Sequence, residues 1–515
     1  MNPELMVCVD TAPESTSSWA RIRSGVRWGV PCPRKPSGLL VAVLAAAGAC
    51  TVGPDHESPA RPQTERYTPV SQPSGPHAPV LDQDVAIPND WWTVFGSPPV
   101  AELVGRALVQ SPTLAAARAR LTQAQELFAA RTGTAWLPQV DATAGAVRQH
   151  IDPAVVGFPQ APNPGVFNVF SLGAEASYVF DVFGGVRREL EALDAGVEFE
   201  TFELEAARLT LASNVVVAAI RMAALDARLD ALEEGLAARR RQLEISEGRL
   251  AAGGVAAVDV RNERSRVLQA EAALPPLRAQ RAHTAHLLAV LTGEPPGTAN
   301  VPAIRLSDLQ LPATLPLRLP AELVRRRPDI RAGEALLHRA CADVGVATAA
   351  LYPSLSLSGS ISSSRLEAND VFGNGINLWN FGANLLAPVF RGGELRARER
   401  AAVAAFEQAG AAYRESVLQA LQNVADVLRS LEHDGHTHAL LSEAAQQAED
   451  AYRVASACLE LGGVSEYAML DAERRRQEAR SERLQSVADR CVDVVALYQA
   501  LGGGGIGDQE PTGSR

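Results

Sequence analysis

Two very long stretches of the chain carry apolar residues at the spacing of paired helices. Residues 186–274 contain no proline, and after Pro388 none occurs until Pro511. Within both stretches apolar side chains recur at steps of three, four or seven, which is the heptad seam of a helix that packs against another helix. At 1.5 Å per residue, residues 186–252 would form a rod of roughly 100 Å. The seam positions are Leu204, Leu211, Val215, Ala218, Met222, Leu225, Leu229, Leu232, Leu236, Leu243 and Leu250, then Val403, Phe406, Gly410, Tyr413, Val417, Leu421, Val424, Leu428 and Leu431.

Four shorter segments alternate with a period of two and predict strands. They lie at about residues 139–148, 168–180, 354–363 and 377–387. A strand of ~10 residues crosses an outer membrane when tilted, with its apolar face toward lipid and its polar face toward a lumen. Alternation alone also fits amphipathic hairpins on a soluble core. Four strands cannot close a membrane barrel, whose smallest members have about eight. Two, three or four copies would supply eight, twelve or sixteen strands, and the alternation does not choose among these numbers.

The second half of the chain repeats the first with a period near 210 residues. Five landmarks return in the same order at offsets of 208 to 216. They include the glycine pairs Gly253-Gly254 and Gly462-Gly463, where each long helix is expected to turn back. A fixed period indicates one structural unit used twice. We therefore expect a first repeat at 97–297, a proline-rich linker at 298–320 and a second repeat at 321–505.

The N-terminus predicts an exported, lipid-modified protein. A basic pair precedes a short apolar run at 38–47, which is too short to span a bilayer and has the length of a signal-peptide core. The run ends in Ala47-Gly48-Ala49-Cys50, a pattern that resembles a bacterial lipobox. Residues 1–49 are then a signal peptide, of which the first ~30 indicate a start site placed too far upstream. The alternative is a buried cysteine after an ordinary signal. Cys50 would carry the lipid, 50–96 would be a lipid-anchored linker, and 506–515 a flexible tail.

Composition excludes several other classes of protein. The 515 residues are 47% hydrophobic and 21% charged, with a net charge of -11, which excludes a disordered tail or a basic coat for nucleic acid. Removing residues 1–49 leaves 43 basic and 56 acidic side chains, a net charge of -13. No apolar stretch of ~18 residues lies outside the N-terminus, so a membrane helix is not expected in the body of the chain.

Motifs for chemistry are equally lacking in the sequence. It contains no nucleophile elbow, no phosphate-binding glycine loop, and no zinc or dinucleotide fingerprint, so we expect neither an enzyme nor a cofactor. His433, His436 and His438 share no helix face and complete no ligand set, so they predict a polar loop that interrupts the second long helix rather than a metal site. Pro275-Pro276 predicts a bend in the first return helix.

Long paired helices, two strand pairs, a duplication and a lipidated start together resemble the TolC-like outer membrane factors of tripartite efflux systems, in their lipoprotein branch. The resemblance runs from Cys50 to about Gly505. Its most specific segments are Cys50-Thr51-Val52-Gly53-Pro54, Trp91-Trp92 with Phe95-Gly96, Arg326-Arg327-Pro328-Asp329-Ile330-Arg331, Leu351-Tyr352-Pro353-Ser354 and Pro388-Val389-Phe390-Arg391-Gly392-Gly393. The family implies a mainly α protein with transmembrane β strands: an obligate homotrimer with a twelve-stranded barrel in the outer membrane and a coiled-coil α-barrel tunnel across the periplasm.

The same resemblance implies a passive exit duct for small toxic compounds or drugs, docked to a periplasmic adaptor and an inner-membrane pump of the RND type. Within this class, a duct for metal efflux or for type I secretion of polypeptides is the alternative. A structural coiled-coil lipoprotein of the periplasm without a pore is the alternative of another class.

The resemblance also places a gate near the two glycine turns. It makes Asp259 a candidate bridge partner, Asp471 a carboxylate repeated around the axis, and Arg474 its local partner. Like charges close together would raise one another's pKa and favour cations at the mouth. The alternative is that all three are solvated charges on helix surfaces.

Overall fold

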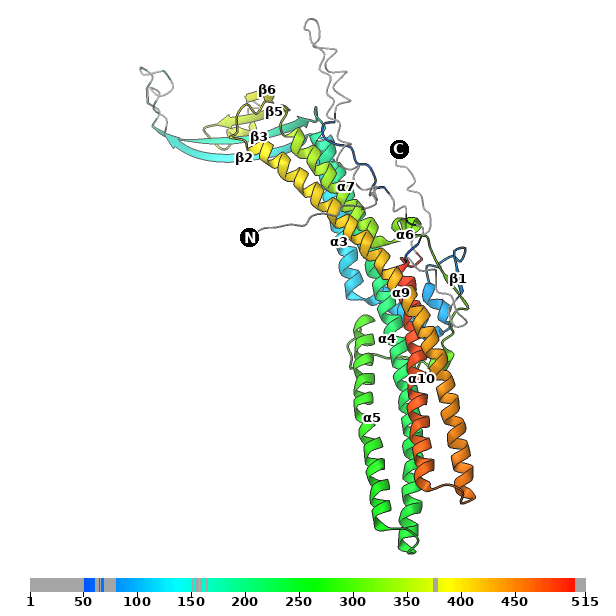
Figure 1. The fold of residues 1–515 in the computed structure, drawn as a ribbon. Helices are drawn as coiled ribbons and strands as arrows, with labels where there is room; N and C mark the ends of the chain where they lie inside the picture. Colours follow the sequence, from blue (N-terminus) through cyan, green and yellow to red (C-terminus); the bar gives the residue numbers. More distant parts are fainter. Residues whose placement is uncertain are drawn as a thin grey trace, which may run out of the picture.

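The computed structural model describes residues 51–504, except 61–63, 65, 69–79, 151, 153–156, 158–159, 161, 164 and 374–377. The molecule is long, with a β-sheet at one end and helix hairpins at the other (Figure 1). Cys50, the expected signal peptide 1–49 and the expected tail 506–515 lie outside the described residues.

Each half of the chain runs through the same series of elements. The first half has α2 (Pro98–Gln110), α3 (Pro112–Trp136), β2 (Gln139–His150), β3 (Val166–Phe180), α4 (Gly185–Ala251) and α5 (Ala257–Leu291). The second has α6 (Pro320–Arg326), α7 (Pro328–Ala349), β5 (Ser354–Arg365), the short α8 (Asp370–Gly373), β6 (Leu378–Leu386), α9 (Glu394–Glu460) and α10 (Glu466–Ala500). Both long helices have 67 residues and both return helices have 35, so the repeat in the sequence is also a repeat in the fold.

The four long strands form one antiparallel sheet in the order β2-β3-β5-β6. Its register puts the apolar residues of all four strands in the same rows, as in Ala142–Ala174–Ile361–Trp379. The row beside it is polar and contains Asp141, Glu175, Ser360 and Asn380. Because side chains alternate across a strand, one face of the sheet is apolar and the other is polar. Among the described residues β2 and β6 each keep one edge unpaired.

The long helices pack along the seams that the sequence predicts. At the lower end α5, α4, α10 and α9 lie side by side in that order (Figure 1). The seam residues at the centre of α4 and α9 are buried, whereas Leu250 near the tip is half exposed. The seam is therefore buried in the middle of the bundle and is more exposed near the turns. The buried seam residues are Leu211, Val215, Ala218, Met222, Leu229, Leu236, Tyr413, Val417, Val424, Leu428 and Leu431.

Among the described helices, α4 is long and apolar enough to cross a membrane, by length and composition alone. Its most apolar window has a mean hydropathy of 1.5, and 61% of that window is buried inside the molecule. The surrounding core explains this composition, because α2, α3, α5, α7 and α10 all contact α4. A helix that is covered on several sides needs apolar residues around its circumference.

The chain around residues 298–320 is not the plain extended linker that its prolines indicate. It contains a 3-10 turn, η4 (Leu306–Asp308), and a strand, β4 (Thr314–Pro316), which pairs in parallel with β1 (Val80–Asp82). Several of its apolar side chains are buried in the main core, including Leu306 and Leu315. The expected N-terminal linker 50–96 is ordered in the same way at η2 (Trp91–Phe95), where Trp91 stacks on Tyr498 with ring centroids 5.4 Å apart.

The expected polar loop at His433, His436 and His438 is wrong. α9 continues through all three histidines as one helix. His438 Nδ1 lies 2.9 Å from Ser486 Oγ of α10, so this histidine is a contact between the two helices. α5 continues through Pro275 and Pro276 as one helix, so these prolines do not end it.

The same part of α9 gives a prediction for stability against pH. Burial, followed by the hydrogen bond and charge of Asp434, raises the pKa of Asp493. A carboxyl whose pKa is raised in the folded protein stabilises the fold at low pH, and this stability is lost as pH rises from the unfolded pKa, about 4, through the folded one. The thermal midpoint should therefore be higher at pH 5.5 than at pH 8, and Asp493→Asn should reduce that difference. Asp426→Asn, an exposed carboxylate on α9, is the control that should leave the difference unchanged.

Candidate functional site

The two helix turns at the lower end are built alike. Gly253 and Gly462 have φ of 77° and 71°, a left-handed conformation that glycine adopts without strain. The next glycine N–H closes each turn: Gly254 donates to the Arg249 carbonyl at 2.8 Å, and Gly463 donates to the Cys458 carbonyl at 2.8 Å. This pattern is the usual glycine ending of a helix, so both glycine pairs act as turns.

The charged candidates near these turns take different positions. Asp259 is exposed in the first turn of α5. Asp471 lies in α10, 3.1 Å from Arg474 and 2.8 Å from Arg475, both on its own helix. Arg474 is thus a local partner, and it also binds Glu478 at 2.7 Å. Within one chain the hydrogen bond from Arg474 lowers the pKa of Asp471, opposite to the expected raising by like charges, which would require neighbouring copies.

Two contacts that sequence analysis missed join one hairpin to the other near the mouth. Gln242 of α4 donates a hydrogen bond to Glu466 at the start of α10. The guanidinium of Arg266 in α5 lies 5.7 Å from the centre of the Tyr467 ring. Neither pair has a distinctive spacing in the sequence, because its members are 201 or more positions apart. Only the packing of α10 against α4 brings them together.

Close to the same mouth, carboxylates are buried between the hairpins. Glu263 of α5 and Glu473 of α10 are 6% and 5% exposed. Burial raises the pKa of Glu473, Arg239 and Arg476 oppose this effect, and Glu263 adds to it. Each glutamate has one buried oxygen without a hydrogen-bond partner among the described residues. The buried polar atoms between the hairpins are therefore only partly hydrogen-bonded, which is consistent with two helix hairpins that separate.

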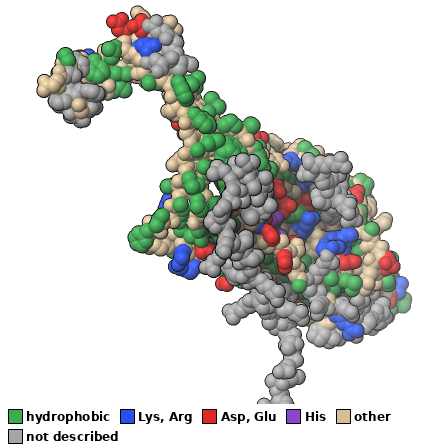
Figure 2. Space-filling view, turned by 90° about the horizontal axis from the view of Figure 1, so that it is seen from above, with side chains coloured by type: hydrophobic (Ala, Val, Ile, Leu, Met, Phe, Trp, Pro, Cys, Tyr) green, Lys and Arg blue, Asp and Glu red, His purple; other side chains and the backbone are tan. Residues whose placement is uncertain are grey.

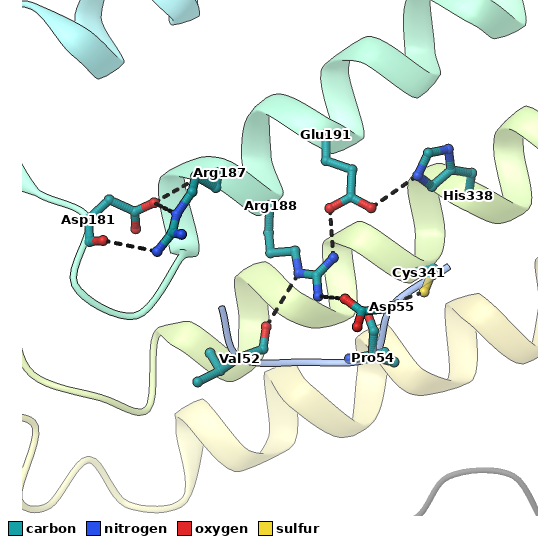
Figure 3. Close-up of polar contacts among 9 residues, drawn as sticks. All are labelled: Val52, Pro54, Asp55, Asp181, Arg187, Arg188, Glu191, His338 and Cys341. Carbon is teal, nitrogen blue, oxygen red and sulfur yellow. Dashed lines mark hydrogen bonds and ion pairs between the residues drawn. The ribbon is translucent and has the colours of Figure 1, made fainter. Parts of the chain in front are cut away.

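A second cluster lies at the opposite end, below the sheet, where residues 51–57 cross α4 and α7. We call these residues the N-terminal strap. Arg188 of α4, whose side chain is 6% exposed, binds Asp55 of the strap at 2.5 Å and Glu191 at 2.7 Å (Figure 3). Its Nε also donates to the Val52 carbonyl at 3.4 Å, while the Val52 N–H donates to the Phe183 carbonyl at 3.1 Å. One buried guanidinium thus fixes the strap to the corner between β3 and α4.

Small residues let the strap approach the helices closely. A Cβ added at Gly53 would lie 2.5 Å from the Cα of Gly345 in α7, and one added at Gly184 would lie 2.5 Å from the Thr51 side chain. Such distances leave no room for a larger residue. The strap is therefore part of the packed wall of the molecule.

The sheet end presents the chemistry expected of a membrane surface. Hydrophobic side chains gather along the arm that the strands form (Figure 2). On the edge strand β6, Trp379, Phe381 and Leu385 are 78%, 73% and 67% exposed. Large apolar side chains in a row on an edge strand must be covered by lipid or by another chain.

The residues that the structure describes contain no group of three or more histidine, cysteine, aspartate or glutamate side chains that could hold a metal ion.

Comparison with known proteins gives a consistent result. The sequence profile of a family described as "Outer membrane efflux protein" matches residues 103–294 and 319–503. The chain is 34% identical over 481 residues to the pyoverdine export outer membrane protein OpmQ of Pseudomonas aeruginosa, covering 92% of this chain and 97% of that protein. It is 28% identical over 470 residues to nodulation protein T of Rhizobium leguminosarum bv. viciae, covering 90% and 93%.

Solved structures agree with the sequence relatives. The outer-membrane channel OprN superposes with a TM-score of 0.77 at 28% identity, covering 88% of this chain and 99% of that one. The predicted function and location are confirmed: the protein is an efflux channel of the outer membrane that extends into the periplasm. The chain belongs to the outer membrane efflux protein family, the outer membrane factors of tripartite efflux systems.

Proposed function

We propose that three copies of this chain close a twelve-stranded barrel and form a passive exit duct for small toxic compounds or drugs. The observation that carries this proposal is the open sheet, which is apolar on one face, polar on the other, and unpaired at β2 and β6. In lipid an unpaired edge leaves backbone groups without hydrogen bonds, so β6 of one copy must pair with β2 of the next. The polar face, with Asp141 and Glu175, then lines the lumen.

The lower end of the duct acts as its gate. Gln242–Glu466 and Arg266–Tyr467 hold the tips of the two hairpins of a chain together, and their loss lets the tips of α9 and α10 move away from those of α4 and α5. Asp471 supplies a carboxylate that three copies would bring around one axis. Asp259, which is exposed at the first turn of α5, would act as a bridge partner for a neighbouring copy.

The upper end is anchored by a lipid on Cys50. Thr51 is the first described residue, and Thr51 and Val52 contact Gly184 and Phe183 at the base of β3. A lipid on the preceding residue would therefore enter the membrane beside the barrel.

The partners follow from the length of the helices and the family. A periplasmic adaptor and an inner-membrane pump of the RND type would meet the lower end of the helix bundle. OpmQ is named for pyoverdine export, which supports a small-molecule cargo over a polypeptide.

The test is a deletion strain, complemented with the wild-type chain or with Cys50→Ala, and exposed to antibiotics, dyes and metals, with pyoverdine export followed in parallel. We expect increased susceptibility to several unrelated compounds in the deletion strain, restoration by the wild type, and weaker restoration by Cys50→Ala, together with loss of the lipid mass from the N-terminal peptide. Unchanged susceptibility to every compound, with loss of a secreted protein, would instead support polypeptide export.

A further inference from the structure

Two histidines that the duct does not need meet where the strap lies on the helices. The ring of His56 in the strap stacks on the ring of His338 in α7, with centroids 4.3 Å apart and planes at 21°. His338 Nε2 lies 3.0 Å from Glu191 Oε1 of α4, and Glu191 also binds Arg188 (Figure 3). The histidine pair is thus joined to the same arginine that holds Asp55 and the Val52 carbonyl.

The surroundings of the pair disfavour a proton on His56. Burial lowers the pKa of His56, and the charge of His338 adds to this, whereas Glu334 and Glu191 oppose it. His338 has a carboxylate, Glu191, at hydrogen-bond distance. Protonation of both rings would place two cations 4.3 Å apart. The charged and titratable groups near His56 are Asp55 and Glu57 of the strap, Arg188 and Glu191 of α4, and Glu334, His338 and Cys341 of α7.

We propose that the N-terminal strap is an acid-released latch, held on α4 and α7 at neutral pH by the uncharged His56 ring and loosened when that ring takes up a proton. The sign follows from linkage. A histidine whose pKa is lowered on docking stabilises the docked state above its free pKa, about 6.5, and this stability is lost as pH falls below that value. The Arg188–Asp55 ion pair is a separate contact that also holds the strap on α4.

The latch has a definite consequence for the channel. The strap starts one residue after Cys50, so a docked strap fixes the N-terminal end of the mature chain against the corner of β3 and α4. A loosened strap frees that end and uncovers the close contact at Gly345. Periplasmic pH, which varies with the medium, thereby controls how rigidly this end is attached to the channel wall. The latch does not depend on the identity of the exported compound.

The experiment is hydrogen exchange of the full chain in detergent at pH 7.5, 6.5 and 5.5, with the exchange of strap residues 51–57 corrected for its intrinsic pH dependence. A single linked proton with a free pKa near 6.5 increases opening by at most about tenfold between pH 7.5 and 5.5. We expect an increase approaching that limit in the wild type. His56→Phe keeps a ring for the stack without a titrating group, and should exchange equally at all three values. His56→Gln serves the same purpose if the phenylalanine variant does not fold.

Arg188→Ala is the matched control, because it loosens the strap without removing the histidines. It should increase exchange at every pH and keep the dependence on pH. Equal opening of the wild-type strap at all three pH values would overturn the latch. The same pH dependence in wild type and in both His56 variants would also overturn it, since another group would then control the strap.

Discussion

Replacing Phe381 by arginine is expected to abolish the detergent-stable oligomer, whereas replacing its neighbour Asn380 by arginine should leave it intact. Phe381 lies near the middle of β6, in the apolar rows of the sheet, and is 73% exposed in a single chain. Asn380 lies on the opposite face, where its amide donates to Ser360 Oγ at 2.9 Å. The two positions share a strand and differ only in the face they occupy.

The size of the effect follows from the cost of a charge in lipid. An arginine on the lipid face near the bilayer midplane costs about 2–4 kcal/mol, and three copies would incur that cost together. An arginine on the lumen side remains in water, so Asn380→Arg loses little beyond one hydrogen bond, about 1 kcal/mol. Phe381→Arg should therefore fail to assemble in the outer membrane while its periplasmic helices still fold.

The measurement is the heat-modifiable band on a semi-native gel, with membrane extraction by urea in parallel. Equal retention of the oligomer in both variants would contradict the assignment of the apolar face to lipid. Loss of the oligomer in both would indicate that β6 tolerates no arginine at residues 380 and 381. The two faces would then be compared with Trp379→Arg and Asn384→Arg, nearer the ends of the strand.

Removing two of the links between the hairpins, those near the mouth, is expected to open the lower end of the duct. The double variant Gln242→Ala with Tyr467→Ala deletes one side of each contact. A hydrogen bond to a charged group contributes about 1.5–3 kcal/mol and an exposed cation–π contact about 0.5–1 kcal/mol. Since about 1.4 kcal/mol changes an equilibrium tenfold, the open population of each chain should rise at least tenfold. Single-channel conductance and entry of vancomycin into cells report this opening.

Arg264→Ala is the matched control for this experiment. Arg264 binds Glu247 at 2.6 Å, close to the same mouth, but this ion pair joins α5 to α4 within one hairpin. Conductance should stay at the wild-type value when it is removed. If Arg264→Ala opens the channel as much as the double variant does, general loosening of the tips and not the link between hairpins controls the gate.

Asp471→Ala separates a role in the gate from a role in selectivity. Arg474 and Arg475 bind the carboxylate on one helix, so its removal should break no contact between hairpins. We expect a larger conductance and a weaker preference for cations if three copies meet at the axis. An unchanged conductance and cation preference would make Asp471 a solvated surface charge.

The heptad seams, the strand alternation and the duplication can be predicted from the sequence because each is a repeated pattern. Val424 and Leu428 belong to a periodic pattern, and a period fixes which face of an element is buried without knowledge of its neighbours. The same holds for Phe381 and Asn380, whose faces follow from a period of two. The family resemblance identified these elements as parts of a channel, because the family's motifs occur in a fixed order along nearly the whole chain.

The structure around isolated side chains is harder to predict from the sequence. The three histidines around Gly435 suggested a loop because they are polar and aperiodic, yet they continue a helix that is stabilised by its packing against α10. Prolines indicated extended linkers where β4 in fact pairs with β1, since a short strand held by a distant partner has too few residues to show a pattern. Propensity is overruled in both cases by contacts from elsewhere in the chain.

The sequence by itself determined the long helices and the four long strands, the two repeats, the apolar and polar faces of those strands, and the family. Only the tertiary structure decided which distant residues meet: Arg188 with Asp55, His56 with His338, Gln242 with Glu466, and Arg266 with Tyr467. The physical reason is that periodic burial is a local property, repeated many times along an element, whereas each of these contacts is made once, between segments more than 100 positions apart. A single polar contact leaves no period in the sequence, so only the packed fold reveals it.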